Sequence, residues 1–117
     1  MKRKKILIAD DEPNILRSLR LVLEEAGYLV LSAIDGEEAL HKTRKEKPDL
    51  LILDIRMPKM NGYEVYKKLQ TDPLQRDVPV MIFTALGEEE QKREGSGTHP
   101  FDTITKPFSP YSILERV

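Results

Sequence analysis

Three aspartates come directly after short apolar segments of the chain. Asp10 and Asp11 follow Ile6–Ala9, and Asp54 follows Leu50–Leu53. If both segments are strands of a parallel sheet, their carboxyl ends meet at one edge, where open α/β folds bind ligands. Three carboxylates at one edge repel one another strongly unless a cation joins them. A hard cation such as Mg²⁺ prefers oxygen ligands, and Asp11 and Asp54 are candidates to supply two of them.

Two further apolar segments end in residues that suit the same chemistry. Thr84 follows the segment 78–83, and Lys106 follows the segment 101–105. Each residue alone is explained more simply, as a strand residue or a surface cation, but their arrival at one edge favours a shared site. That site suits phosphoryl transfer to a carboxylate, with Asp54 as the nucleophile that forms an acyl phosphate. Mg²⁺ and Lys106 would offset the negative charge, and Thr84 would donate a hydrogen bond.

The segments that position these residues alternate between strand and helix patterns. Strands are expected at 6–9, 28–33, 50–53, 78–83 and 101–105, and helices at 13–26, 37–45, 63–70, 88–94 and 111–117. Asp35-Gly36 is expected to form a turn, and helical spacing after Asn61-Gly62 argues against a hairpin there. Such alternation predicts a doubly wound, five-stranded parallel sheet of flavodoxin-like order 2-1-3-4-5 with helices on both faces.

Composition limits the class of protein. The 117 residues suit a single domain spanning 1–117, whose last helix would be cut short at its end. A net charge of -1 argues against direct nucleic-acid contact, which usually needs a basic surface. No apolar stretch approaches the roughly 18 residues of a membrane span. The absence of cysteine fits a reducing compartment, so a cytoplasmic location is expected.

Four separated motifs resemble receiver domains of two-component response regulators, the superfamily of the chemotaxis receivers. The resemblance spans essentially the whole chain and implies a phosphorylation-activated signalling switch that receives its phosphoryl group from a histidine kinase or a phosphotransfer protein. It implies control of an output domain or a downstream protein, and homodimerisation on phosphorylation is common in the family. The motifs are Ile6–Pro13, Asp54–Gly62, Thr84-Ala85 and Ile104–Phe108.

The resemblance also implies a role for each residue of the site. Asp54 would be the phosphoacceptor, and Mg²⁺ would be held by Asp11, Asp54 and the main-chain carbonyl of Arg56. Asp10 would support the ion through water, and Lys106 would contact the phosphate. Thr84 would move to meet the phosphoryl group. The chain would thus assist its own phosphorylation and dephosphorylation without being a dedicated phosphatase.

The segment after Thr84-Ala85 departs from the family pattern. Gly95 and Gly97 each weaken a helix by roughly 1 kcal/mol relative to alanine, so the fourth helix is expected to be short or irregular. Thr103 occupies the position of the family's switch aromatic. Local drift on a tolerant surface and a different output face are both open interpretations. We hypothesise that coupling outward from Thr84 does not use an aromatic rotamer.

Three other classes of protein were weighed. A phosphatase of the haloacid dehalogenase type needs a second Asp two residues after the nucleophile, where this chain has Arg56. A flavodoxin-like electron carrier needs a phosphate-cradling loop after the first strand, where Asp10-Asp11-Glu12 would repel a flavin phosphate. A receiver that binds a partner without phosphorylation stays open, although Asp54, Thr84 and Lys106 argue against it.

Overall fold

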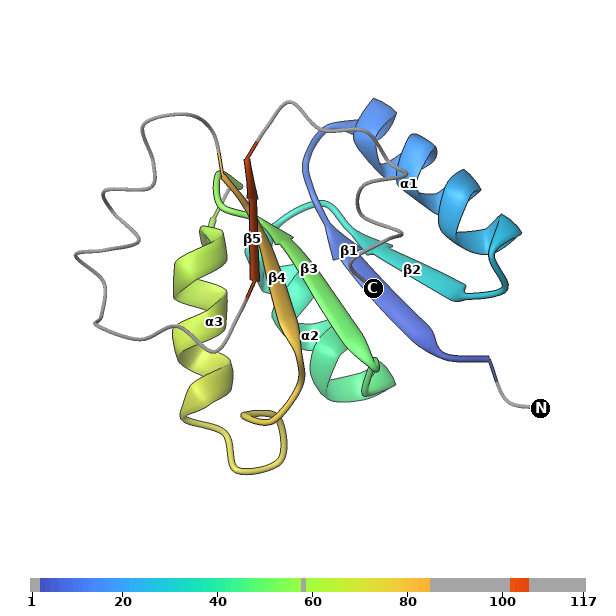
Figure 1. Ribbon diagram of the computed structural model, residues 1–117. Helices are drawn as coiled ribbons and strands as arrows, with labels where there is room; N and C mark the ends of the chain where they lie inside the picture. Colours follow the sequence, from blue (N-terminus) through green and yellow to red (C-terminus); the bar gives the residue numbers. More distant parts are fainter. Residues whose placement is uncertain (1–2, 58, 85–101, 106–117) are drawn as a thin grey trace.

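The computed structural model describes residues 3–57, 59–84 and 102–105 (Figure 1). The expected helices at 88–94 and 111–117, the segment 95–100 and Lys106 lie outside these residues. The described elements run, in chain order, β1 (Lys5–Ala9), α1 (Pro13–Glu25), β2 (Leu29–Ala33), α2 (Gly36–Glu46), β3 (Leu50–Asp54), α3 (Gly62–Gln70), β4 (Val80–Thr84) and β5 (Asp102–Thr105).

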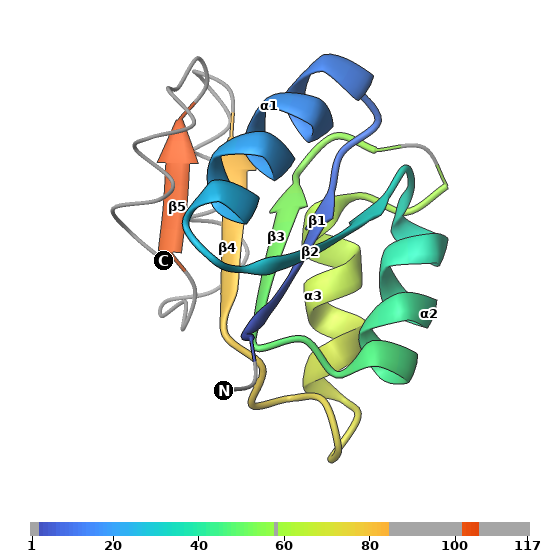
Figure 2. The same ribbon diagram turned by 90° about the vertical axis from the view of Figure 1, so that its right-hand side faces the viewer.

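The strands form one parallel sheet in the order β2-β1-β3-β4-β5, which confirms the predicted fold class. Their arrowheads all point toward the same edge (Figure 2). At that edge Ala9 is level with Ala33 on one side and with Leu53 on the other, while Asp54 is level with Phe83. The register therefore places the residues after β1 and at the end of β3 side by side.

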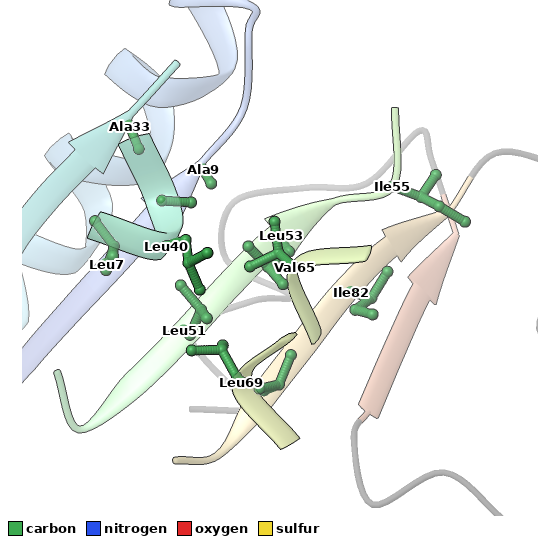
Figure 3. Packing of buried hydrophobic residues seen from close by; sticks show 12 residues of the cluster. Leu7, Ala9, Ala33, Leu40, Leu51, Leu53, Ile55, Val65, Leu69 and Ile82 are labelled. Carbon is green, nitrogen blue, oxygen red and sulfur yellow. The ribbon is translucent and has the colours of Figure 1, made fainter. Parts of the chain in front are cut away.

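Side chains of the inner strands alternate between two buried layers. α1 covers one face of the sheet, and α2 and α3 cover the other (Figure 2). Successive residues of a strand point to opposite sides of the sheet, and these residues are apolar without interruption, so both faces are apolar. Burying each Leu or Ile contributes roughly 1.5–3 kcal/mol. The α1 face is formed by Ile6, Ile8, Leu19, Leu23, Val30, Ile52, Met81 and Phe83. The other face includes Leu7, Leu40, Leu51, Leu53, Val65, Leu69 and Ile82 (Figure 3).

Two helices begin with side-chain caps that the sequence analysis did not assign. The Asp35 carboxylate accepts from the Glu38 N–H at 2.8 Å, so α2 starts at Gly36 rather than at Glu37. The expected turn at Asp35-Gly36 is therefore wrong in detail, because it is the N-cap of the helix. At α3, Asn61 and Glu64 form a reciprocal capping box, with N···O distances of 2.9 and 3.0 Å. Such caps stabilise a helix by about 1 kcal/mol each.

The fourth strand begins later than expected. The sequence suggested a start at residue 78, whereas β4 begins at Val80. The Val78 N–H donates to the Gln75 carbonyl at 3.1 Å, which keeps this segment in a turn. Pro79 has no N–H to give to a sheet, although its carbonyl accepts from the Leu51 N–H at 2.9 Å. Among the described helices, none has both the length and the apolar character needed to cross a membrane.

Candidate functional site

Adjacent strands β1 and β3 bring three carboxylates together at the carboxyl edge of the sheet. Oxygen atoms of Asp10, Glu12 and Asp54 all lie within 4.8 Å of one another, and we call these residues the acidic group. Asp10 is 0% exposed and Asp54 is 4% exposed. Two buried carboxylates at this separation require either protonation or a cation, because burial in a low-dielectric environment strengthens their repulsion.

Backbone hydrogen bonds hold the acidic group in place. The Asp10 N–H donates to the Ala33 carbonyl at 3.0 Å, which extends the pairing of β1 with β2 by one residue. The Asp10 carboxylate accepts from the Glu12 N–H at 2.9 Å. The Asp54 carboxylate accepts from the Arg56 N–H at 3.3 Å. Each aspartate thus bonds to the N–H two residues later, and both carboxylates are oriented by their own loops.

Asp11 is not a member of the acidic group. Asp11 and Glu12 are both exposed, and the structure places Glu12 in the group. The hydrogen bond from Glu12 to Asp10 is an Asx-turn, and it turns the chain so that Glu12 comes near Asp54. The Asp-x-Glu spacing was a signal for this turn that the sequence analysis did not use. Direct coordination by Asp11 stays a prediction.

The segment that follows β3 returns closely onto Asp54. The Ile55 N–H donates to the Phe83 carbonyl at 3.1 Å, and the Gly62 N–H donates to the Ile55 carbonyl at 3.0 Å. A Cβ atom at position 62 would lie 2.7 Å from the Asp54 carbonyl oxygen. Glycine at 62 therefore lets the first turn of α3 rest on the backbone of the candidate nucleophile.

The remaining site residues belong to the strands on the other side of Asp54. Thr84 is the last residue of β4, one position beyond Phe83, which is level with Asp54. Thr84 is level with Thr105, the last residue of β5, and Lys106 is the next residue in the sequence. The backbone register thus puts the ends of β3, β4 and β5 at one edge of the sheet, while Lys106 lies outside the described residues.

The donor set of the acidic group fits a hard divalent cation. All three ligand candidates are carboxylates, which Mg²⁺ and Ca²⁺ prefer over nitrogen or sulfur ligands. At an effective dielectric constant of about 20, two unit charges 4.8 Å apart repel by about 3.5 kcal/mol. A divalent ion between them would replace this repulsion with attraction. The described residues therefore form an acidic site that could hold a metal ion.

A doubly wound parallel sheet with an acidic site at its carboxyl edge defines a class of α/β domain that binds ions or phosphate groups at the strand ends. Comparison with known proteins identifies the family within this class. Residues 6–117 match the family model for the response regulator receiver domain, so the chain belongs to that family.

Similar proteins agree with this assignment. The alkaline phosphatase synthesis transcriptional regulatory protein PhoP of Bacillus subtilis is 46% identical over 97% of this chain and 47% of its own length. A probable transcriptional regulator, ycf27 of Guillardia theta, is 42% identical over 98% of this chain and 44% of its own length. The chain thus spans about half the length of these relatives. The chemotaxis protein CheY4 of Vibrio cholerae has a TM-score of 0.88 at 33% identity, covering 98% of this chain and 96% of that one.

Family membership decides between the classes weighed from the sequence. The resemblance to receiver domains is confirmed, and the phosphatase and electron-carrier alternatives are set aside. The family and its relatives are those of a phosphorylation-activated two-component signalling switch.

Proposed function

We propose that this domain accepts a phosphoryl group on Asp54 from a phosphohistidine of a histidine kinase or a phosphotransfer protein. The observation that carries the proposal is the acidic group, in which the buried Asp54 lies with Asp10 and Glu12 at the carboxyl edge of the sheet. Asp54 ends the central strand β3, so it lies between the β1 carboxylates and the ends of β4 and β5. It is therefore the carboxylate best placed to be reached by all the other groups.

The proposed reaction is a direct transfer between the two side chains. A carboxylate oxygen of Asp54 attacks phosphorus and forms a P–O bond. The P–N bond of the phosphohistidine breaks, and the imidazole nitrogen keeps the electron pair and takes up a proton. The product is an acyl phosphate, which water later hydrolyses to free Asp54 and inorganic phosphate. The domain assists both steps and is a signalling phosphoacceptor rather than a dedicated phosphatase.

The metal in this proposal is Mg²⁺. It would supply positive charge that lowers the repulsion between Asp54 and the incoming phosphoryl group. Asp54 and the main-chain carbonyl of Arg56 would hold it from β3, and the residues after β1 would hold it from the other side. There, Asp10 and Glu12 have the support of the acidic group, and Asp11 has that of the family motif.

Two further residues complete the proposed chemistry. Thr84 would donate a hydrogen bond to a phosphoryl oxygen, and Lys106 would be the countercharge on the other side of the phosphate. Support comes from the backbone register, since Thr84 is level with Thr105 at the same edge as Asp54. A change at Thr84 would then be transmitted to the surface beyond β4, where Thr103 of β5 stands in place of an aromatic residue.

The whole protein is proposed to be a regulator of which this chain, residues 1–117, is the receiver domain. PhoP and ycf27 are named as transcriptional regulators and are about twice as long, which supports a C-terminal output domain or a downstream partner that controls transcription. The receiver itself has a net charge of -1 and would not contact nucleic acid. Homodimerisation on phosphorylation and a cytoplasmic location, where a kinase has its ATP, belong to the same proposal.

The proposal is tested by phosphorylation from a small donor. The wild-type domain, incubated with acetyl phosphate and Mg²⁺, should gain the mass of one phosphoryl group, and the gain should be lost on brief exposure to base or hydroxylamine. Asp54→Asn should gain nothing. Asp77→Asn, a matched change at an exposed position, should behave as wild type. A wild-type protein that binds Mg²⁺ and gains no mass, or a gain that survives in Asp54→Asn, would overturn the proposal.

A further inference from the structure

Two segments that are distant in sequence meet where the loop after β3 passes the start of α2. The first is the start of α2, Asp35–Glu37, and the second is Lys59-Met60 in the loop between β3 and α3 (Figure 2). A Cβ atom at position 36 would lie 2.5 Å from the Met60 Cβ and closer still to the Met60 carbonyl oxygen. The loop backbone therefore rests directly on the first residue of α2, and only glycine leaves room for it.

Lys59 adds an electrostatic contact between the same segments. Its Nζ atom lies 3.8 Å from an Asp35 oxygen and 3.9 Å from a Glu37 oxygen. Asp35 is the N-cap of α2, so one of its oxygens holds Glu38 while the other faces the ammonium group. Lys59 also has a φ of 68°, a left-handed conformation that side-chain-bearing residues rarely adopt. The backbone accepts this unfavourable conformation at the point where the loop meets α2.

The other end of this loop is attached to Asp54. The Arg56 N–H bonds to the Asp54 carboxylate, and the Gly62 N–H bonds to the Ile55 carbonyl. The loop is thus closed at its base by β3 and α3, and its outer part is supported by α2. Met60 also packs on the core layer beneath α2 and α3, so the loop contacts the hydrophobic core as well as the start of α2.

We infer that the start of α2 is a support for the phosphoacceptor loop, and that Gly36 and Lys59 are positioning residues. Through them, the α2 terminus fixes where the loop places the Arg56 backbone relative to the Asp54 carboxylate. Neither residue is assigned contact with the metal or the phosphoryl group. The functional part of this inference rests on the proposed function, because it concerns the geometry of the metal site.

Lys47 offers a matched control for Lys59. It is also an exposed lysine with a positive φ, of 50°, but it caps the opposite end of α2. Lys59→Ala removes the charge and leaves a residue with a side chain in the same unfavourable positive-φ conformation. Lys47→Ala makes the same chemical change away from the loop. Lys59→Arg retains a cation and should preserve the contact. Thermal unfolding of each variant in EDTA establishes that it is folded.

The first measurement is the rate of amide hydrogen exchange, monitored by NMR in the presence of EDTA. In Lys59→Ala the Arg56 and Gly62 amides should exchange about 3–5-fold faster, the effect expected from loss of an exposed ion pair. Lys47→Ala and Lys59→Arg should match wild type. Unchanged exchange in Lys59→Ala, or equal acceleration in Lys47→Ala, overturns the inference. Gly36→Ala should accelerate exchange at the same amides; if it fails to fold, Lys59→Ala decides alone.

The second measurement is the dissociation constant for Mg²⁺ by titration calorimetry. Lys59→Ala should weaken binding about 3–5-fold, with recovery in Lys59→Arg. An unchanged constant would overturn the positioning role even if amide exchange had changed. A wild-type domain that binds no Mg²⁺ would instead contradict the metal site of the proposed function, and the amide exchange alone would then decide whether α2 supports the loop.

Discussion

Replacing Asp54 by asparagine should make the metal-free domain more stable. Asp54 and Asp10 are almost fully buried, with ligand oxygens within 4.8 Å of each other. At an effective dielectric constant of about 20, their repulsion is about 3.5 kcal/mol when both are ionised. The net gain is smaller than this repulsion, because every group that pairs with the Asp54 carboxylate, the Arg56 N–H among them, loses a charged acceptor worth about 1 kcal/mol more than a neutral one. We expect a gain of about 1–3 kcal/mol in the free energy of unfolding.

The gain can be measured by urea and thermal unfolding in EDTA. For a domain of this size, about 1 kcal/mol corresponds to a rise of roughly 4 °C in Tm. The matched Asp77→Asn variant should stay within about 0.5 kcal/mol of wild type, as exposed substitutions usually do.

Adding Mg²⁺ should shift the difference in stability between Asp54→Asn and wild type in favour of the wild type. At a hundred times its dissociation constant, the ion should stabilise the wild type by about 2.7 kcal/mol and leave Asp54→Asn nearly unchanged. The repulsion argument is refuted if Asp54→Asn is less stable than wild type in EDTA. It is also refuted if Asp77→Asn gives the same gain.

Three further predictions concern the surroundings of the site. Glu12→Gln should weaken Mg²⁺ binding more than Asp11→Asn if the acidic group is the binding site; calorimetry that gives the opposite order would restore Asp11 as the direct ligand. Gly62→Ala should cost about 1–3 kcal/mol of unfolding free energy, because its Cβ would overlap the backbone of β3, and it should slow phosphorylation by acetyl phosphate; wild-type values in both assays would contradict the packing argument. Burial raises the pKa of the Tyr66 hydroxyl, so the folded state binds its proton more tightly than the unfolded state, and stability should fall as pH rises above about 10. Unfolding titrations of Tyr66→Phe should show a shallower fall over this range, and an identical slope would refute the assignment.

The sequence by itself determined the fold class and two of the carboxylates at the carboxyl edge of the sheet, Asp10 and Asp54. The segments 6–9 and 50–53 are apolar throughout, and only central strands of a parallel sheet bury both of their faces. Helical spacing between such segments then implies right-handed crossovers and a small set of strand orders. Because ligands gather at the carboxyl edge of such sheets, Asp10 and Asp54 were recognisable from their positions after these segments alone.

Tertiary structure alone decided which groups meet at that edge. Distances between residues far apart in sequence depend on register and on turns. An Asx-turn at Asp10 brings Glu12, rather than Asp11, into the acidic group. The support of the phosphoacceptor loop by Gly36 and Lys59 likewise joins segments more than twenty residues apart. Periodicity and composition describe each segment separately, so they contain no information about contacts that form only when the chain closes on itself.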